Sequence, residues 1–88
     1  MNTRHHRKAT ELGITPEAVA QVDRDYFTAL RQARQELGLS PLYRNFDAAQ
    51  LDHMLQIIEA RNPDLNRHQI VDILGYNLNK KTRRALGL

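Results

Sequence analysis

The chain contains no cysteine and no tryptophan, and aromatic residues make up only 6% of it. Without cysteine, neither a disulfide framework nor thiolate chemistry is available. This absence fits a reducing compartment, and we expect a cytoplasmic protein. Long apolar runs are also missing, because none approaches the roughly 18 residues that indicate a membrane span. We therefore expect no membrane contact.

The sequence is equally poor in groups that carry catalysis. Its single serine, Ser40, directly precedes a proline and has no base nearby in the sequence to activate it. No glycine-rich phosphate loop occurs. His5 and His6 are adjacent and would point apart on a helix, so they form no convincing metal pair. We expect a protein that is not an enzyme and has no cofactor, no metal and no small-molecule substrate.

No segment alternates apolar and polar residues with a period of two, and no hairpin dipeptide is present, so no strand is expected. The 88 residues suffice for one domain with a modest core. The sequence therefore predicts an all-α fold, a small bundle of about four helices. These helices are expected over residues 15–37, 47–61, 66–75 and 78–86, within a single helical domain that spans residues 15–88.

The first predicted helix is the longest and has the clearest start. Thr15 is placed to cap it, Pro16 occupies the first helical position, and Glu17 meets the positive end of the helix dipole. Apolar residues then recur at steps of three and four up to Leu37. Gly38 is expected to end the helix.

The next two helices each begin with a capping box. Asp47 and Gln50 form the first box, and Asn66 and Gln69 form the second. Gly75 is expected to end the third helix by adopting the left-handed conformation. Asn77 or Asn79 would then cap the short fourth helix.

The charge of the chain is distributed unevenly. Residues 1–14 carry three basic residues and one acid, a net charge of +2, and residues 66–88 carry five basic residues and one acid, a net charge of +4. The middle, residues 15–65, has five basic and eight acidic residues, a net charge of −3. Because residues 1–14 lack apolar periodicity, we interpret them as a disordered, flexible basic tail. This asymmetry is typical of nucleic-acid binders and of proteins with acidic partners, although charge placed for solubility gives the same pattern.

The segment from Asn66 to Leu86 contains a capped apolar helix, a glycine turn and a basic second helix. In this order, and in the apolar pattern from Gln69 to Gly75, it resembles a helix-turn-helix DNA-binding motif. The resemblance covers residues 66–86 only. It departs from the motif in the second helix, where Lys81, Thr82 and Arg84 stand at positions that usually carry aliphatic residues.

This resemblance implies a small DNA-binding regulator, and we expect it to form a dimer through its first helix. Lysine and arginine would contact phosphates, Arg83 or Arg84 would pair with guanine, and Asn77 or Asn79 with adenine. The basic tail would reach a minor groove. The residues expected to contact DNA are Arg4, Arg7, Lys8, Arg67, Asn77, Asn79, Lys80, Lys81, Thr82, Arg83 and Arg84.

The alternative function is a protein-binding regulator, an inhibitor or an adaptor. The long first helix has apolar residues on more than one side, and its exposed part would be covered by a second copy or another protein. The acidic middle of the chain is a further candidate surface. The residues expected to contact a partner are Val19, Val22, Tyr26, Phe27 and Leu30.

Overall fold

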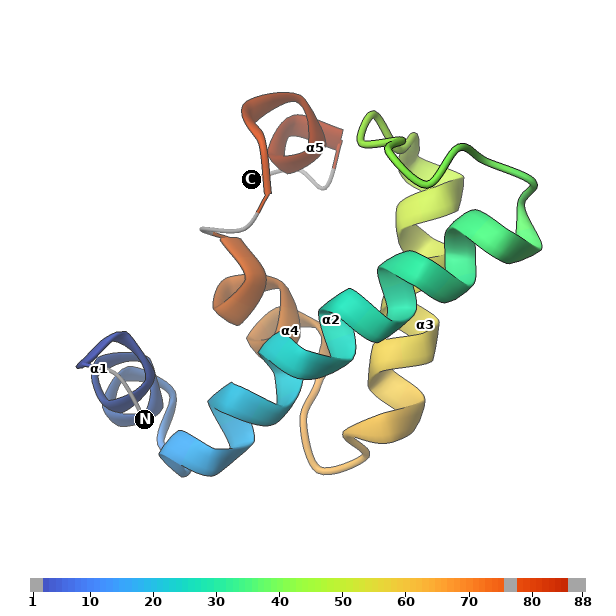
Figure 1. Cartoon of the computed structure of the whole chain (residues 1–88). Helices are drawn as coiled ribbons and strands as arrows, with labels where there is room; N and C mark the ends of the chain where they lie inside the picture. Colours follow the sequence, from blue (N-terminus) through green and yellow to red (C-terminus); the bar gives the residue numbers. More distant parts are fainter. Residues whose placement is uncertain (1–2, 76–77, 86–88) are drawn as a thin grey trace.

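The computed structural model describes residues 3–75 and 78–85, and this part of the chain is built from helices without any strand (Figure 1). The all-α prediction is confirmed. Three of the predicted helices are found within one residue of their expected ends, and the last, at 78–86, is found over a shorter range. The helices are α1 (Thr3–Leu12), α2 (Pro16–Glu36), α3 (Ala48–Arg61), α4 (Arg67–Leu74) and α5 (Lys80–Ala85).

Helix α2 is the element against which α1, α3 and α4 pack (Figure 1). Its 21 residues extend about 32 Å. The Thr15 hydroxyl accepts a hydrogen bond from the Ala18 amide at 3.1 Å, which confirms the predicted cap. At the other end Gly38 has a φ of 66°, and the Leu39 amide reaches back to the Arg34 carbonyl at 2.8 Å. This left-handed glycine ends the helix as expected.

Two groups of buried side chains hold the bundle together. The larger group lies where α1, α2, α3 and α4 meet, and its fully buried members include Val22, Ile58 and Ile70. The smaller group lies between the second half of α2 and the start of α3, with Phe46 packed edge-on against Tyr43 at a centroid distance of 5.2 Å. Burial of these apolar side chains is the main favourable contribution to folding.

The prediction of a disordered tail over residues 1–14 is wrong for its central part. Residues Thr3–Leu12 form helix α1, which packs on α2 and buries Ala9 to 2% exposure. Gly13 adopts a φ of 68°, and the Ile14 amide bonds to the Ala9 carbonyl at 3.0 Å. The helix is therefore ended by a left-handed glycine, and its order comes from contacts with α2 that periodicity alone does not indicate.

Both predicted capping boxes are present. Asp47 and Gln50 exchange hydrogen bonds at the start of α3, and Asn66 and Gln69 do so at the start of α4. The expected left-handed conformation of Gly75 is wrong, because its φ of −50° and ψ of −39° are right-handed helical values. Gly75 therefore extends the last turn of α4.

A buried polar cluster joins the middle of α2 to the end of α3. Asp25 is only 2% exposed, and one of its carboxylate oxygens accepts a hydrogen bond from the side-chain amide of Asn62 at 2.9 Å. Gln21 donates to both carboxylate oxygens at 3.0 Å, and Arg61 lies 3.1 Å away. The Asn62 side-chain amide also donates to the Ile58 carbonyl at 2.9 Å, so it has hydrogen-bond acceptors on both helices.

Replacing Asp25 by alanine should lower the free energy of unfolding by about 2–4 kcal/mol, because the buried Asn62 amide loses a charged acceptor and a cavity replaces the carboxylate. Urea denaturation followed by circular dichroism at 222 nm measures this change. Asp64→Ala is the control, since Asp64 is exposed and its loss should change stability by no more than about 0.5 kcal/mol. Equal effects of the two substitutions would show that the cluster is not stabilising.

Candidate functional site

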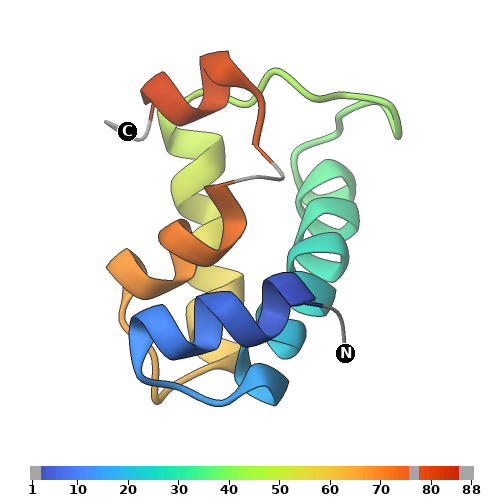
Figure 2. The ribbon, with the colours of Figure 1, turned by 90° about the vertical axis from the view of Figure 1, so that its left-hand side faces the viewer.

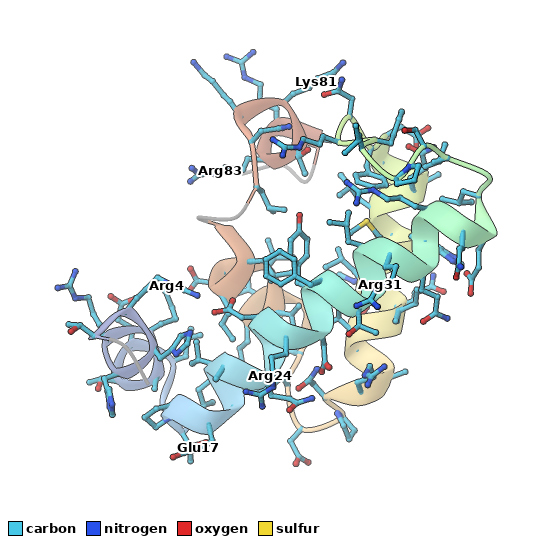
Figure 3. The ribbon with its side chains drawn as sticks, in the orientation of Figure 1. Arg4, Glu17, Arg24, Arg31, Lys81 and Arg83 are labelled. Atoms are coloured by element: carbon cyan, nitrogen blue, oxygen red, sulfur yellow. The ribbon has the colours of Figure 1, made fainter. Side chains whose placement is uncertain are left out.

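Basic residues from both ends of the sequence meet in a cleft between α1, α4 and α5. Figure 2 shows these three helices stacked on one side of the bundle, with α4 in the middle. The cleft has a volume of about 600 Å³. In Figure 3, Arg4 and Arg83 both lie on the side of the molecule where α1 and α5 are found. The charged and titratable residues that line this basic cleft are Arg4, Arg7, Lys8, Glu11, His68, Asp72 and Arg83.

Two of these cations are already neutralised within the protein. Arg4 forms an ion pair with Asp23, which also contacts His5 Nε2 at 2.8 Å. Lys8 Nζ lies 2.9 Å from Glu11 and 3.2 Å from Asp72. The hydrogen bond to Glu11, together with that to Asp72, raises the pKa of Lys8. Arg4 and Lys8 therefore hold α1 against its neighbours, and they are less available for DNA than the sequence suggested.

Helix α5 presents four cations that are free of such pairing with the described residues. The side chains of Lys80, Lys81, Arg83 and Arg84 are all exposed, and none has a hydrogen bond or ion pair with another described residue. Arg7 of α1 is exposed in the same way. No acidic residue occurs in α5. Lys81 points outward from the end of the bundle in Figure 3.

Three other residues expected to contact DNA are placed differently. Arg67 binds Asp52 and, at 2.6 Å, Glu59, so it links α4 to α3. These hydrogen bonds, first of all the one to Asp52, raise the pKa of Arg67.

Thr82 is 4% exposed and faces the bundle, so its expected DNA contact is wrong. The Asn79 side chain caps α5 by accepting from the Thr82 amide at 2.8 Å, and Asn77 lies outside the described residues.

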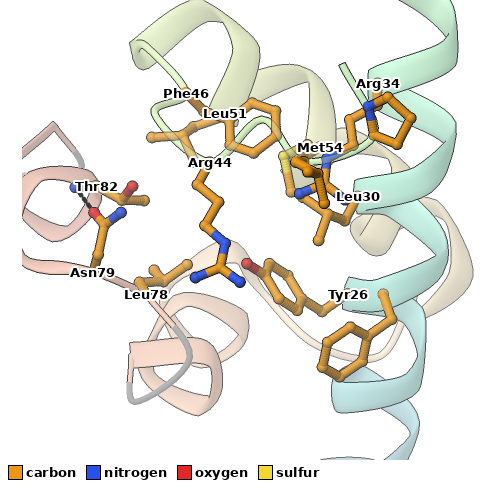
Figure 4. Close-up of a pocket in the computed structure, with 13 residues that line it drawn as sticks. Tyr26, Leu30, Arg34, Arg44, Phe46, Leu51, Met54, Leu78, Asn79 and Thr82 are labelled. Carbon is orange, nitrogen blue, oxygen red and sulfur yellow. Dashed lines mark hydrogen bonds between the residues drawn. The ribbon is translucent and has the colours of Figure 1, made fainter. Parts of the chain in front are cut away.

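A second cleft, here called the apolar cleft, lies on the other side of α5 and reaches α2 and the connector between α2 and α3 (Figure 4). Its volume is about 480 Å³, within the range of sites that bind ligands. Two large apolar side chains at the cleft are exposed, Phe27 to 57% and Leu42 to 83%. The lining residues are Tyr26, Phe27, Leu30, Arg34, Pro41, Leu42, Arg44, Phe46, Leu51, Met54, Leu78, Asn79 and Thr82.

Two arginines give the apolar cleft a positive charge. Arg34 donates to the Tyr43 carbonyl through Nε at 3.0 Å and through Nη2 at 2.6 Å, which fixes its guanidinium. Arg44 reaches across the cleft so that its guanidinium lies between Leu78 and Tyr26 in Figure 4. Burial raises the pKa of the Tyr26 phenol, and the charges of Arg34 and Arg44 oppose this rise.

The residues expected to contact a protein partner divide into two groups. Val19 and Val22 are 0% exposed and belong to the core, so their assignment to a partner surface is wrong. The periodicity that suggested them marks the inner face of α2. Phe27 is exposed, while Tyr26 and Leu30 are half-buried, and all three line the apolar cleft.

Several residues of the two clefts were missed by reasoning from the sequence. Arg34 lies off the apolar stripe of α2, and Arg44 and Leu42 stand in a connector without periodicity. No local signal indicates that the connector folds over α2. His68 and Asp72 are four residues apart, the ordinary spacing of neighbours on a helix surface, and the sequence does not show that α1 approaches His68.

No protein-family model, no curated protein and no solved structure matches this chain. None of the helices in the described part is long and apolar enough to cross a membrane. Within residues 3–75 and 78–85, no three histidine, cysteine, aspartate or glutamate side chains gather as a metal site requires.

Replacing Arg44 by glutamine should raise the pKa of Tyr26 further above its ordinary value of 10.0, because one of the two opposing charges is removed. Absorbance at 295 nm during an alkaline titration measures this change. The experiment uses a background in which Tyr43 and Tyr76 are replaced by phenylalanine, so that Tyr26 is the only tyrosine. Arg31→Gln is the control, since Arg31 does not line the apolar cleft. An unchanged midpoint in the Arg44 variant would show that its guanidinium does not lie near the phenol.

Proposed function

We propose that this protein is a small DNA-binding regulator whose contact surface is α5. The observation that carries the proposal is the set of exposed cations on α5, which have neither an acidic residue within the helix nor an ion-pair partner among the described residues. Unpaired lysine and arginine side chains bind phosphates and release condensed counterions, which is the main source of affinity for DNA.

Helix α1 adds to this surface from the same side of the bundle. Arg7 is exposed beside the basic cleft, and Arg83 of α5 lines the same cleft. Cations that are far apart in the sequence therefore face a duplex together. Counting Arg7 with the four cations of α5 gives about five phosphate contacts.

In this proposal, α4 and α5 correspond to the two helices of a helix-turn-helix motif. Helix α4 packs in the bundle, and α5 faces the DNA. Thr82 points inward and the Asn79 oxygen caps the helix, so the side chains available for base edges are Arg83 and Arg84. Arginine pairs with guanine in the major groove. With so few groups for base contacts, most of the affinity comes from phosphates and depends little on sequence.

Fluorescence anisotropy of a mixed-sequence duplex, repeated across salt concentrations, tests the proposal. Five phosphate contacts predict that log K falls against log salt with a slope of roughly −4.5. Removing two contacts by the double substitution Lys81→Ala and Arg84→Ala should make this slope shallower by about 1.8 and weaken binding roughly 10- to 100-fold. Alanine favours helix, so α5 should persist in the variant.

The matched control removes the same charge from a different face. Arg24 and Arg31 are exposed on α2, away from both basic ends (Figure 3). The double substitution Arg24→Ala and Arg31→Ala should leave the salt slope unchanged. Equal losses in the two variants would mean that only net charge matters, and the absence of binding at low salt would overturn the proposal.

A further inference from the structure

The apolar cleft combines two chemical properties that bear on what it could bind. Most of its lining residues are apolar or aromatic, and its charged lining residues, Arg34 and Arg44, are both cations. No acidic residue is found among the described residues that line it. An occupant that complements this cleft is apolar over most of its contact and carries negative charge at its edge.

We propose that the apolar cleft is the docking site for an acidic, amphipathic segment of a protein partner. An apolar side chain of that segment enters between Tyr26, Leu30 and Met54, and a neighbouring carboxylate binds the guanidinium of Arg44. This inference goes beyond DNA binding and does not depend on it. It assigns a specific surface and a specific charge to the partner.

The exposed apolar residues at the cleft favour a peptide over a small molecule. Leu42 is 83% exposed and Phe27 is 57% exposed, and they stand on two different elements, the connector and α2. A small molecule inside the cleft would cover only the part of each side chain that lines the cleft. A peptide chain that runs across the cleft covers them, and exposed apolar side chains gathered in this way typically indicate an interaction site.

The two arginines are suited to bind a carboxylate in different ways. Arg34 is held by the Tyr43 carbonyl at 3.0 Å and 2.6 Å, so its charge is fixed in place before any partner arrives. Arg44 is exposed and has no partner among the described residues, and its fork of donors is free for a bidentate contact. The cations of α5 extend the positive potential beyond the cleft and accelerate the approach of an acidic partner.

Selection from a random 12-residue peptide library displayed on phage, with the full-length chain immobilised, tests this inference without knowledge of the partner. We expect the selected peptides to be enriched in aspartate and glutamate next to leucine, phenylalanine or tryptophan. The affinity of the most enriched synthetic peptide, labelled with fluorescein, is then measured by anisotropy. Its Glu→Gln and Asp→Asn counterpart should bind at least tenfold more weakly.

Variants of the chain locate the site. Arg44→Gln and Leu42→Ser change exposed side chains, so both variants should keep the helical circular dichroism spectrum. Each should weaken the selected peptide roughly tenfold, since arginine and apolar anchors dominate binding at interfaces. Arg31→Gln removes the same charge outside the cleft and should leave the peptide affinity unchanged.

Three results would overturn the inference: no peptide is enriched, the enriched peptides are not acidic, or Arg44→Gln weakens the peptide no more than Arg31→Gln. DNA titration separates this failure from that of the proposed function. Arg44→Gln should retain more of its duplex affinity than the double variant at Lys81 and Arg84. If Arg44→Gln instead weakens the duplex and not the peptide, the cleft belongs to the DNA surface and the docking site is rejected.

Discussion

The arrangement of the helices depends on the buried contact between Asp25 and Asn62. Asn62 ends α3 just before Pro63, at the point where the chain turns toward α4. Its side-chain amide binds the Asp25 carboxylate of α2 and the Ile58 carbonyl of its own helix. A buried carboxylate is costly unless its hydrogen bonds are satisfied, so only a narrow range of positions of α3 on α2 is favourable. The apolar contacts supply the stability of the bundle, and this polar contact selects one packing among those that bury similar area.

Much of the fold could be predicted from local signals. The caps at Thr15, Asp47 and Asn66 are short-range hydrogen bonds between residues three apart, and a sequence displays such pairs directly. Helix α1 was missed because its burial rests on Ala9, a small residue that gives little periodicity, and because α2 supplies the contact. The conformation of Gly75 was misjudged for a related reason. A glycine permits the left-handed region without requiring it, and the surrounding structure decides.

The candidate surfaces could be predicted only in part. The exposed cations of α5 follow from composition, because a run of like charges cannot be buried. The neutralisation of Arg4 and Lys8 could not be foreseen, since their partners lie on other helices or on a turn of α1 whose existence was not expected. The apolar cleft could not be foreseen for the same reason, because its lining residues come from segments far apart in the sequence. Arg44 becomes significant only once the connector packs beside α2, and no residue near it in the sequence indicates that path.

Helix α5 forms a wall between the two clefts, with Arg83 lining one and Thr82 the other. Among its described residues only Thr82 is buried, and α5 is absent from the principal helix pairings that join α1, α2, α3 and α4. The local free energy that holds this wall is therefore small compared with that of the bundle. A ligand in either cleft would order the same helix. When both ligands bind, the conformational entropy of α5 is therefore lost only once. Two ligands that both require an ordered α5 therefore favour each other's binding even without touching, which is cooperativity through conformational entropy.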